Sequence, residues 1–139
     1  MPVYLLDTNV LSELIRKSPD RGVTAAVKRL DQRAAFSSEV TLFELRYGAM
    51  RRGDAATFWS RLENELIPAV QWLPVDRAIQ LRAADLAADL DHRGERIGNE
   101  DCWIAATAIE HRLTLVTRNL RHFERIPSLR VESWFEDSP

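Results

Sequence analysis

The chain has little of what cross-links small proteins. Of its 139 residues only one is cysteine and three are histidine, so an intrachain disulfide is excluded and no paired Cys/His zinc spacing occurs. A chain of this length hides about two thirds of the surface that it exposes when unfolded, which is enough to fold without such links. We expect a single domain over residues 1–139 in a reducing, cytoplasmic setting.

Long apolar runs and an excess of positive charge are also missing. No run approaches the roughly 18 residues of a membrane span, and no charged segment followed by an apolar one opens the chain. Nineteen basic and 21 acidic residues give a net charge of -2 at pH 7, which excludes a nucleic-acid binder that works through a strongly basic overall field. Only Lys17 and Lys28 are lysines, so the cations are almost all arginines, which hold phosphates and carboxylates in a planar fork.

Short apolar runs rich in strand formers alternate with segments of helical periodicity. We expect strands at Val3–Leu6, Ala34–Ser37, Val70–Val75, Leu113–Thr117 and Leu129–Val131. We expect helices at Val10–Lys17, Gly22–Gln32, Thr41–Arg52, Ala55–Leu66, Ile79–Leu90 and Gly98–Ile109. This alternation predicts an α/β fold, a three-layer sandwich with a central, mostly parallel β-sheet flanked by helices.

Four polar residues stand where strands end or where the following helices begin. Asp7 ends the first strand, and Asn119 follows the strand that ends at Thr117. Glu44 and Asp101 lie in the first turns of predicted helices. Because ligands of such sheets bind beyond the carboxyl ends of the strands, all four could face one crevice.

Each of these residues also has a purely structural explanation. Asp7 suits a helix N-cap, and Asp101 lies near the positive end of a helix dipole. Glu44 completes a capping box with Thr41, and Asn119 could cap the short helix after it. These explanations do not account for the strongly apolar segments beside Asp7 and Asp101, where an unpaired carboxylate is costly. A shared cation would remove that cost.

Three convergent carboxylates suit a hard divalent cation such as Mg²⁺ or Mn²⁺. Such an ion can bind a phosphate oxygen and activate a water for in-line attack, and a second ion would stabilise the leaving oxygen. No P-loop and no dinucleotide-binding glycine pattern competes for the chain. The pattern therefore predicts phosphodiester hydrolysis.

Four blocks of the sequence support a narrower interpretation. They are Leu5–Glu13, Thr41–Gly48, Asp101–Ala108, and Thr117–Asn119 with Phe123. In order and spacing these blocks resemble the PIN-domain family and, within it, the VapC-type toxins of bacterial toxin-antitoxin pairs, from Val3 to Trp134. The resemblance implies a metal-dependent endoribonuclease that acts on RNA, a cognate antitoxin that wraps the toxin and blocks its site, and dimerisation through helices near the amino end, hence a homodimer and a toxin-antitoxin hetero-oligomer.

The resemblance also assigns roles by position. Asp7 and Asp101 would be the principal metal ligands, and Glu44 would bind the metal directly or through water. Relatives often carry an acid at the position of Asn119 or of His122, although the Asn119 amide still offers an oxygen. One negative charge fewer should weaken a second ion more than the first, so we expect one firmly bound metal.

Further residues beside these blocks are candidates for supporting roles. Thr8, Asn9 and Thr117 lie at strand ends, where they would orient ligands or water, and packing and capping explain them almost as well.

For RNA, the candidates are Arg46, Arg118 and His122, the last as a proton donor or a phosphate contact. A solvated surface position is the alternative for each of them. Candidates for antitoxin contact are the apolar side chains of Phe58, Trp59 and Trp72.

Two other classes with acids at strand ends fit less well. A receiver-type signalling domain relies on a lysine late in the chain, whereas the last lysine here is Lys28. A haloacid-type phosphatase wants Asp-x-Asp after its first strand, whereas Asp7-Thr8-Asn9 supplies one acid. The alternative that stays open is a catalytically weakened PIN-like scaffold that binds RNA or antitoxin, because Asn119 is neutral.

Overall fold

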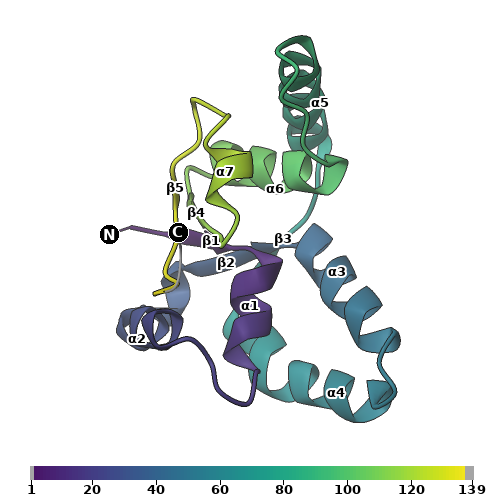
Figure 1. Cartoon of the computed structure of the whole chain (residues 1–139), viewed down its shortest axis with the longest axis vertical. Coiled ribbons are helices and arrows are strands. Elements are labelled where there is room, and N and C mark those ends of the chain that lie inside the picture. The colour runs from purple at the N-terminus through teal and green to yellow at the C-terminus, as the bar shows by residue number, and fades with distance from the viewer. Residues whose placement is uncertain (1, 137–139) are drawn as a thin grey trace.

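The sheet of the computed structural model, which describes residues 2–136, has five strands in the order β3-β2-β1-β4-β5 (Figure 1). Every pairing between them is parallel, which confirms the predicted fold class. The strands are β1 Tyr4–Leu6, β2 Ala35–Ser38, β3 Gln71–Leu73, β4 Thr114–Val116 and β5 Val131–Glu132. The last strand therefore lies slightly later than the expected Leu129–Val131.

Helices connect successive strands and cover the sheet. They are α1 Thr8–Leu14, α2 Arg21–Arg29, α3 Glu39–Met50, α4 Ala55–Arg61, α5 Arg77–His92, α6 Asn99–Glu110 and α7 Leu120–Phe123. Helix α4 continues as a π-helical turn at Leu62–Leu66 and a 3₁₀ turn at Ile67–Ala69, and another 3₁₀ turn lies at Gln32–Ala34. Within residues 2–136, none of the helices has the length and apolar composition that crossing a bilayer would take.

The two leucines of β1 show how the layers form. Successive strand residues point to opposite faces, so Leu5 packs with residues of α5 and α6 and with Phe123 of α7, whereas Leu6 packs with residues of α1 to α4. Figure 1 shows α5, α6 and α7 on one side of the sheet and α1, α2 and α4 on the other. Both leucines are almost fully buried, which makes β1 the centre of a three-layer sandwich.

Helix α3 begins earlier than expected. It starts at Glu39, because Ser38 is the N-cap and its hydroxyl accepts a hydrogen bond of 3.1 Å from the backbone amide of Val40. Glu39 then lies in the first turn, where the helix dipole favours an acid. The expected start at Thr41 is wrong, and Glu44 lies in the second turn instead of closing a capping box.

Helix α1 ends at Leu14, three residues before the expected end at Lys17. The carboxylate of Glu13 is 5% exposed and accepts hydrogen bonds from the Asp20 amide (2.7 Å) and the Arg16 guanidinium (3.2 Å). These bonds draw the following loop back toward the helix, so the chain leaves the helical path before Lys17.

The burial of β1 predicts a large cost for truncating it. Leu5→Ala, at a side chain with no exposed surface, should lower the free energy of unfolding by about 2–5 kcal/mol, since a cavity would remain between sheet and helices. Leu81→Ala on α5 is the control, because Leu81 is 63% exposed. Urea unfolding of both variants measures the difference, and equal losses would contradict the assigned layers.

Candidate functional site

A cavity of about 1000 Å³ opens beyond the carboxyl ends of the central strands and extends between α1, α3 and α4. The structure brings seven of the predicted site residues to its wall: Asp7, Thr8, Asn9, Glu44, Asp101, Arg118 and Asn119. They come from segments far apart in the sequence that the parallel sheet gathers at one edge.

Asp7 lies deepest among the acids. Its amide donates to the Val116 carbonyl (3.0 Å), so the residue is fixed where β1 meets β4. One carboxylate oxygen accepts from the Thr8 amide and the other from the Thr117 hydroxyl, both at 2.8 Å. Burial raises the pKa of Asp7 to about 6, and the charges of Asp101 and Glu44 add to the rise, against these hydrogen bonds.

Glu44 and Asp101 are the other two acids, and each is held by one neighbour. The Thr8 hydroxyl donates to Glu44 Oε1 at 2.6 Å, and His122 Nδ1 lies 3.3 Å from Asp101 Oδ2. Burial is the main cause that raises the pKa of both carboxyls, and nearby negative charge raises it further. Negative charge is therefore unfavourable on all three acids.

The surplus of negative charge fits a bound cation. Among the ion pairs of residues 2–136, none joins Asp7, Glu44 or Asp101 to an arginine or a lysine. Carboxylate and amide oxygens are the donors that hard divalent ions prefer. As they lie, no three His, Cys, Asp or Glu side chains of residues 2–136 are arranged to hold an ion. The donor set thus fits such an ion in its chemistry, and the hydrogen bonds from Thr8 and His122 would have to yield for the carboxylates to converge.

The predicted supporting residues join the end of β4 to the start of α1. The Thr117 hydroxyl donates to the Asp7 carboxylate and accepts from the backbone N–H of Asn119 at 3.0 Å. The Asn9 side-chain oxygen accepts from the Arg118 amide at 3.0 Å. These bonds fix the direction of the Asp7 carboxylate and the path of the chain toward Asn119.

Asn119 occupies the N-cap position of α7, yet its side chain makes no capping hydrogen bond there. Its side-chain nitrogen, Nδ2, instead lies 2.8 Å from His122 Nδ1, the atom that also approaches the Asp101 carboxylate. Asn119, His122 and Asp101 therefore form one polar cluster at the edge of the cavity.

The structure does not place Arg46 at the cavity. Its guanidinium lies over the Trp59 ring of α4, 4.8 Å from the ring centre. Two residues along a helix turn a side chain to nearly the opposite face from Glu44, so expecting Arg46 beside the acids was wrong. Arg118 does line the cavity, with its guanidinium over the Phe135 ring at 4.6 Å.

The sequence interpretation missed four residues that line the far part of the cavity: Arg16, Lys17, Arg52 and Arg61. It named two others that also line this part, Gly48 only within a sequence block and Phe58 only as a candidate for antitoxin contact. A signal for Gly48 and Arg52 was present, because residues spaced four apart from Glu44 share one face of a helix, although α3 ends at Met50 and Arg52 lies in the turn after it.

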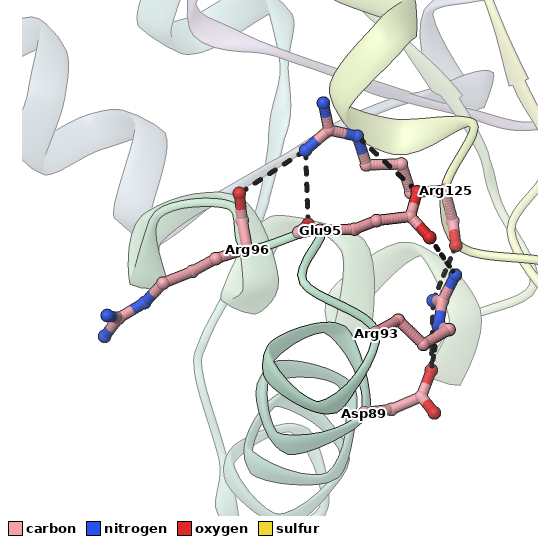
Figure 2. A network of polar contacts seen from close by, with 5 residues as sticks. All are labelled: Asp89, Arg93, Glu95, Arg96 and Arg125. Atoms are coloured by element: carbon pink, nitrogen blue, oxygen red, sulfur yellow. Dashed lines mark hydrogen bonds and ion pairs between the residues drawn. The ribbon is translucent and has the colours of Figure 1, made fainter.

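A pair of arginines fixes the approach of the chain to Asp101 (Figure 2). Arg125, just after α7, donates to the carbonyls of Glu95 and Arg96 in the loop that leads into α6. In return Arg93 donates to the Arg125 carbonyl at 2.8 Å. The segments that carry Asp101 and His122 are therefore tied to each other outside the cavity as well as inside it.

Known proteins resemble this chain over nearly its full length. The family model of the PIN domain matches residues 4–129. The VapC ribonuclease Y4jK of Sinorhizobium fredii is 41% identical over 137 residues, which cover 95% of this chain and 98% of that protein. The tRNA(fMet)-specific endonuclease VapC of Salmonella typhimurium is 32% identical, over 94% of this chain and 97% of that protein. The crystal structure of DNA-bound VapBC from Salmonella typhimurium superposes with a TM-score of 0.87 at 31% identity, over 96% of this chain and 99% of that one.

The raised pKa of Asp7 predicts how stability depends on pH when EDTA removes metal. The folded protein keeps the Asp7 proton up to about pH 6, whereas the unfolded chain releases it near the ordinary value of 3.8. The stability from the protonated form is therefore fully present below pH 3.8 and is lost as the pH rises through about 6. Asp7→Asn cannot ionise and should be more stable than the wild type at pH 8, by up to about 3 kcal/mol.

Urea unfolding in EDTA at pH 4 and pH 8 measures this difference. Asp85→Asn, at an exposed position of α5, controls for the substitution itself. If Asp7→Asn is less stable than the wild type at pH 8, the ionised carboxylate is well stabilised and the inference about it is wrong.

Proposed function

The chain belongs to the PIN-domain family, in its VapC ribonuclease group, and from that premise we propose that it is a metal-dependent endoribonuclease toxin neutralised by a cognate antitoxin. The observation that carries the proposal is the gathering of Asp7, Glu44 and Asp101 on one cavity without an arginine or lysine counter-charge among the ion pairs of residues 2–136. Relatives that match nearly the whole chain are named ribonucleases or endonucleases, which supports RNA as the substrate.

Asp7 and Asp101 would be the principal ligands of Mg²⁺ or Mn²⁺, with Glu44 and Asn119 completing the donor set. The ion, when bound, would polarise a phosphate oxygen and lower the pKa of a water for in-line attack. The Thr117 hydroxyl and the Thr8 amide orient the two oxygens of Asp7, so this ligand is in place before substrate arrives.

Other residues of the site act on the substrate side. The Thr8 hydroxyl holds one oxygen of Glu44 and would release it when the carboxylates converge on the ion. Arg118 brings positive charge to the wall of the cavity beside Asn119, where a phosphate would approach. His122 borders Asp101, and we assign to it a proton donation to the leaving oxygen or a contact with a phosphate.

Solved neighbours of this chain are complexes titled VapBC and FitAB, some of them with DNA. They support a toxin-antitoxin hetero-oligomer with a protein antitoxin as partner, since other neighbours are titled as toxin-antitoxin complexes or systems. We propose a homodimer of the toxin within it. The place of action would be the cytoplasm, where RNA and the antitoxin are both made.

Removing one acidic ligand should abolish cleavage of RNA. Purified protein incubated with a pool of cellular RNAs should cleave in Mg²⁺ or Mn²⁺ and not in EDTA. Asp7→Asn and Asp101→Asn should each lower the rate by at least about a hundredfold, since even residues that only support ligands contribute about 10- to 100-fold. Product formation on a gel measures it, with Asp85→Asn as control.

Cleavage that survives both EDTA and the two substitutions would refute the metal mechanism. A wild-type protein that binds RNA and never cleaves it would favour the weakened scaffold. Growth arrest on expression, relieved by a co-expressed antitoxin, tests the toxin role independently.

The neutral Asn119 predicts the number of ions. Calorimetric titration of EDTA-treated protein with Mn²⁺ should show one firm site, because a second ion would share too little negative charge. Asn119→Asp should strengthen any second, weaker site. Two tight sites of similar affinity in the wild type would contradict the expectation.

A further inference from the structure

Beyond the acids, the cavity continues to an end with a different character. Glu44 and Gly48 lie one turn apart on α3, and Arg52 lies two residues beyond the end of this helix at Met50. The helix advances about 9 Å over the six residues from Glu44 to Met50. On the facing wall, α1 runs from Thr8 to Leu14, with Asp7 as its N-cap. Figure 1 shows α1 and α3 diverging from the sheet, with α4 crossing beyond them. The cavity lined by these helices therefore has an acidic end at the sheet and a distant end near the tip of α1.

The distant end is rich in cations: Arg16, Lys17, Arg52 and Arg61 line it. We call it, together with Gly48, the basic arm. Arg52 pairs with Asp54, and Arg61 pairs with Glu65 and donates to the Ile15 carbonyl, which joins α4 to the end of α1. Neither Asp54 nor Glu65 lines the cavity, so the arginine side chains and not these acids face it.

The charges within the basic arm leave Lys17 available. Glu13 is the acid on this part of the wall. It is buried, and its carboxylate accepts hydrogen bonds from the backbone N–H of Asp20 and the guanidinium of Arg16. The Arg16 side chain is still 64% exposed. Among residues 2–136, Lys17 finds no hydrogen-bond or ion-pair partner. A ligand with negative charge would meet exposed cations here.

Gly48 gives that ligand room. A Cβ built on this residue would have no atom within 4 Å, so no close contact with another helix requires glycine. Its φ is not in the left-handed region either. A glycine inside a helix weakens it relative to alanine, and here it leaves the backbone of α3 open to the cavity between the acidic end and the cations.

We propose that the basic arm binds the stretch of single-stranded RNA that continues from the cleaved bond, with a sugar or base passing Gly48 and phosphates reaching Lys17 and Arg16. This inference rests on the proposed function and extends it to a subsite. A volume of about 1000 Å³ is at the upper end for a single drug-sized ligand, so it accommodates more than one nucleotide. Cationic walls suit a phosphate backbone better than an apolar peptide segment.

Filling the passage is the first test. Gly48→Leu introduces a good helix former, so its thermal midpoint should not fall below that of the wild type. It should lower cleavage of cellular RNA in Mg²⁺ by about tenfold or more, because the contacts of a displaced nucleotide are lost. Mn²⁺ affinity by calorimetry should not change. Gly53→Leu is the matched control, since Gly53 also has open space around it and lies outside the cavity.

Removing the charge is the second test. Binding of a labelled, mixed-sequence single-stranded RNA is measured by anisotropy on the Asp7→Asn protein at several salt concentrations. Lys17→Gln should weaken binding and reduce the slope of log K against log salt by about 0.7, the loss of one phosphate contact. Lys28→Gln on α2 is the control, because Lys28 is exposed and lines none of the cavity.

The outcomes separate the two proposals. If the wild type cleaves RNA while Gly48→Leu and Lys17→Gln behave like their controls, the basic arm is not an RNA subsite. If Gly48→Leu cleaves normally and only escapes neutralisation by the antitoxin, the arm belongs to the antitoxin and our inference is overturned. If the wild type cleaves nothing, the proposed function fails, and the binding series still decides the role of the arm.

Discussion

The buried carboxylate of Asp7 is the constraint on which the site depends. It ends the central strand, where its amide bonds to β4 and its oxygens are held by Thr8 and Thr117. Because burial raises the pKa of Asp7 to about 6, the carboxylate is unfavourable unless it is protonated or a cation binds to it. The negative charges of Glu44 on α3 and Asp101 on α6 make the Asp7 carboxylate still less favourable, since they face the same cavity.

Contacts between the elements around Asp7 hold the three acids close to one another. Thr8 joins α1 to Glu44 of α3, and His122 joins α7 to Asp101 of α6. The arginine pair Arg93 and Arg125 ties the segments before α6 and after α7 outside the cavity. Separate parts of the chain thus hold a geometry in which like charges face one another, which fits a site that works with a divalent ion.

The net charge of -2 says little about the partner, because the charges are divided along one cavity. Carboxylates gather at the edge of the sheet and cations at the far end of α1, α3 and α4. A bound divalent ion would reverse the sign of the field at the acidic end, so that a phosphate backbone would meet positive charge along the whole wall. A near-neutral chain is therefore compatible with an acidic polymer as substrate.

Periodicity and spacing in the sequence by themselves determined the α/β alternation, the buried strand before Asp7 and the acids that follow strands, because these depend on local patterns of apolar residues. Only the tertiary structure decided that Ser38, not Thr41, caps α3, so that Glu44 closes no capping box and lines the cavity instead. It also decided that Arg46 lies on Trp59 and that Gly48, Arg52 and Lys17 border the same space as Asp7. The reason is that a helix start depends on competing caps, and a cavity wall on how separate helices pack, neither of which is a property of one segment.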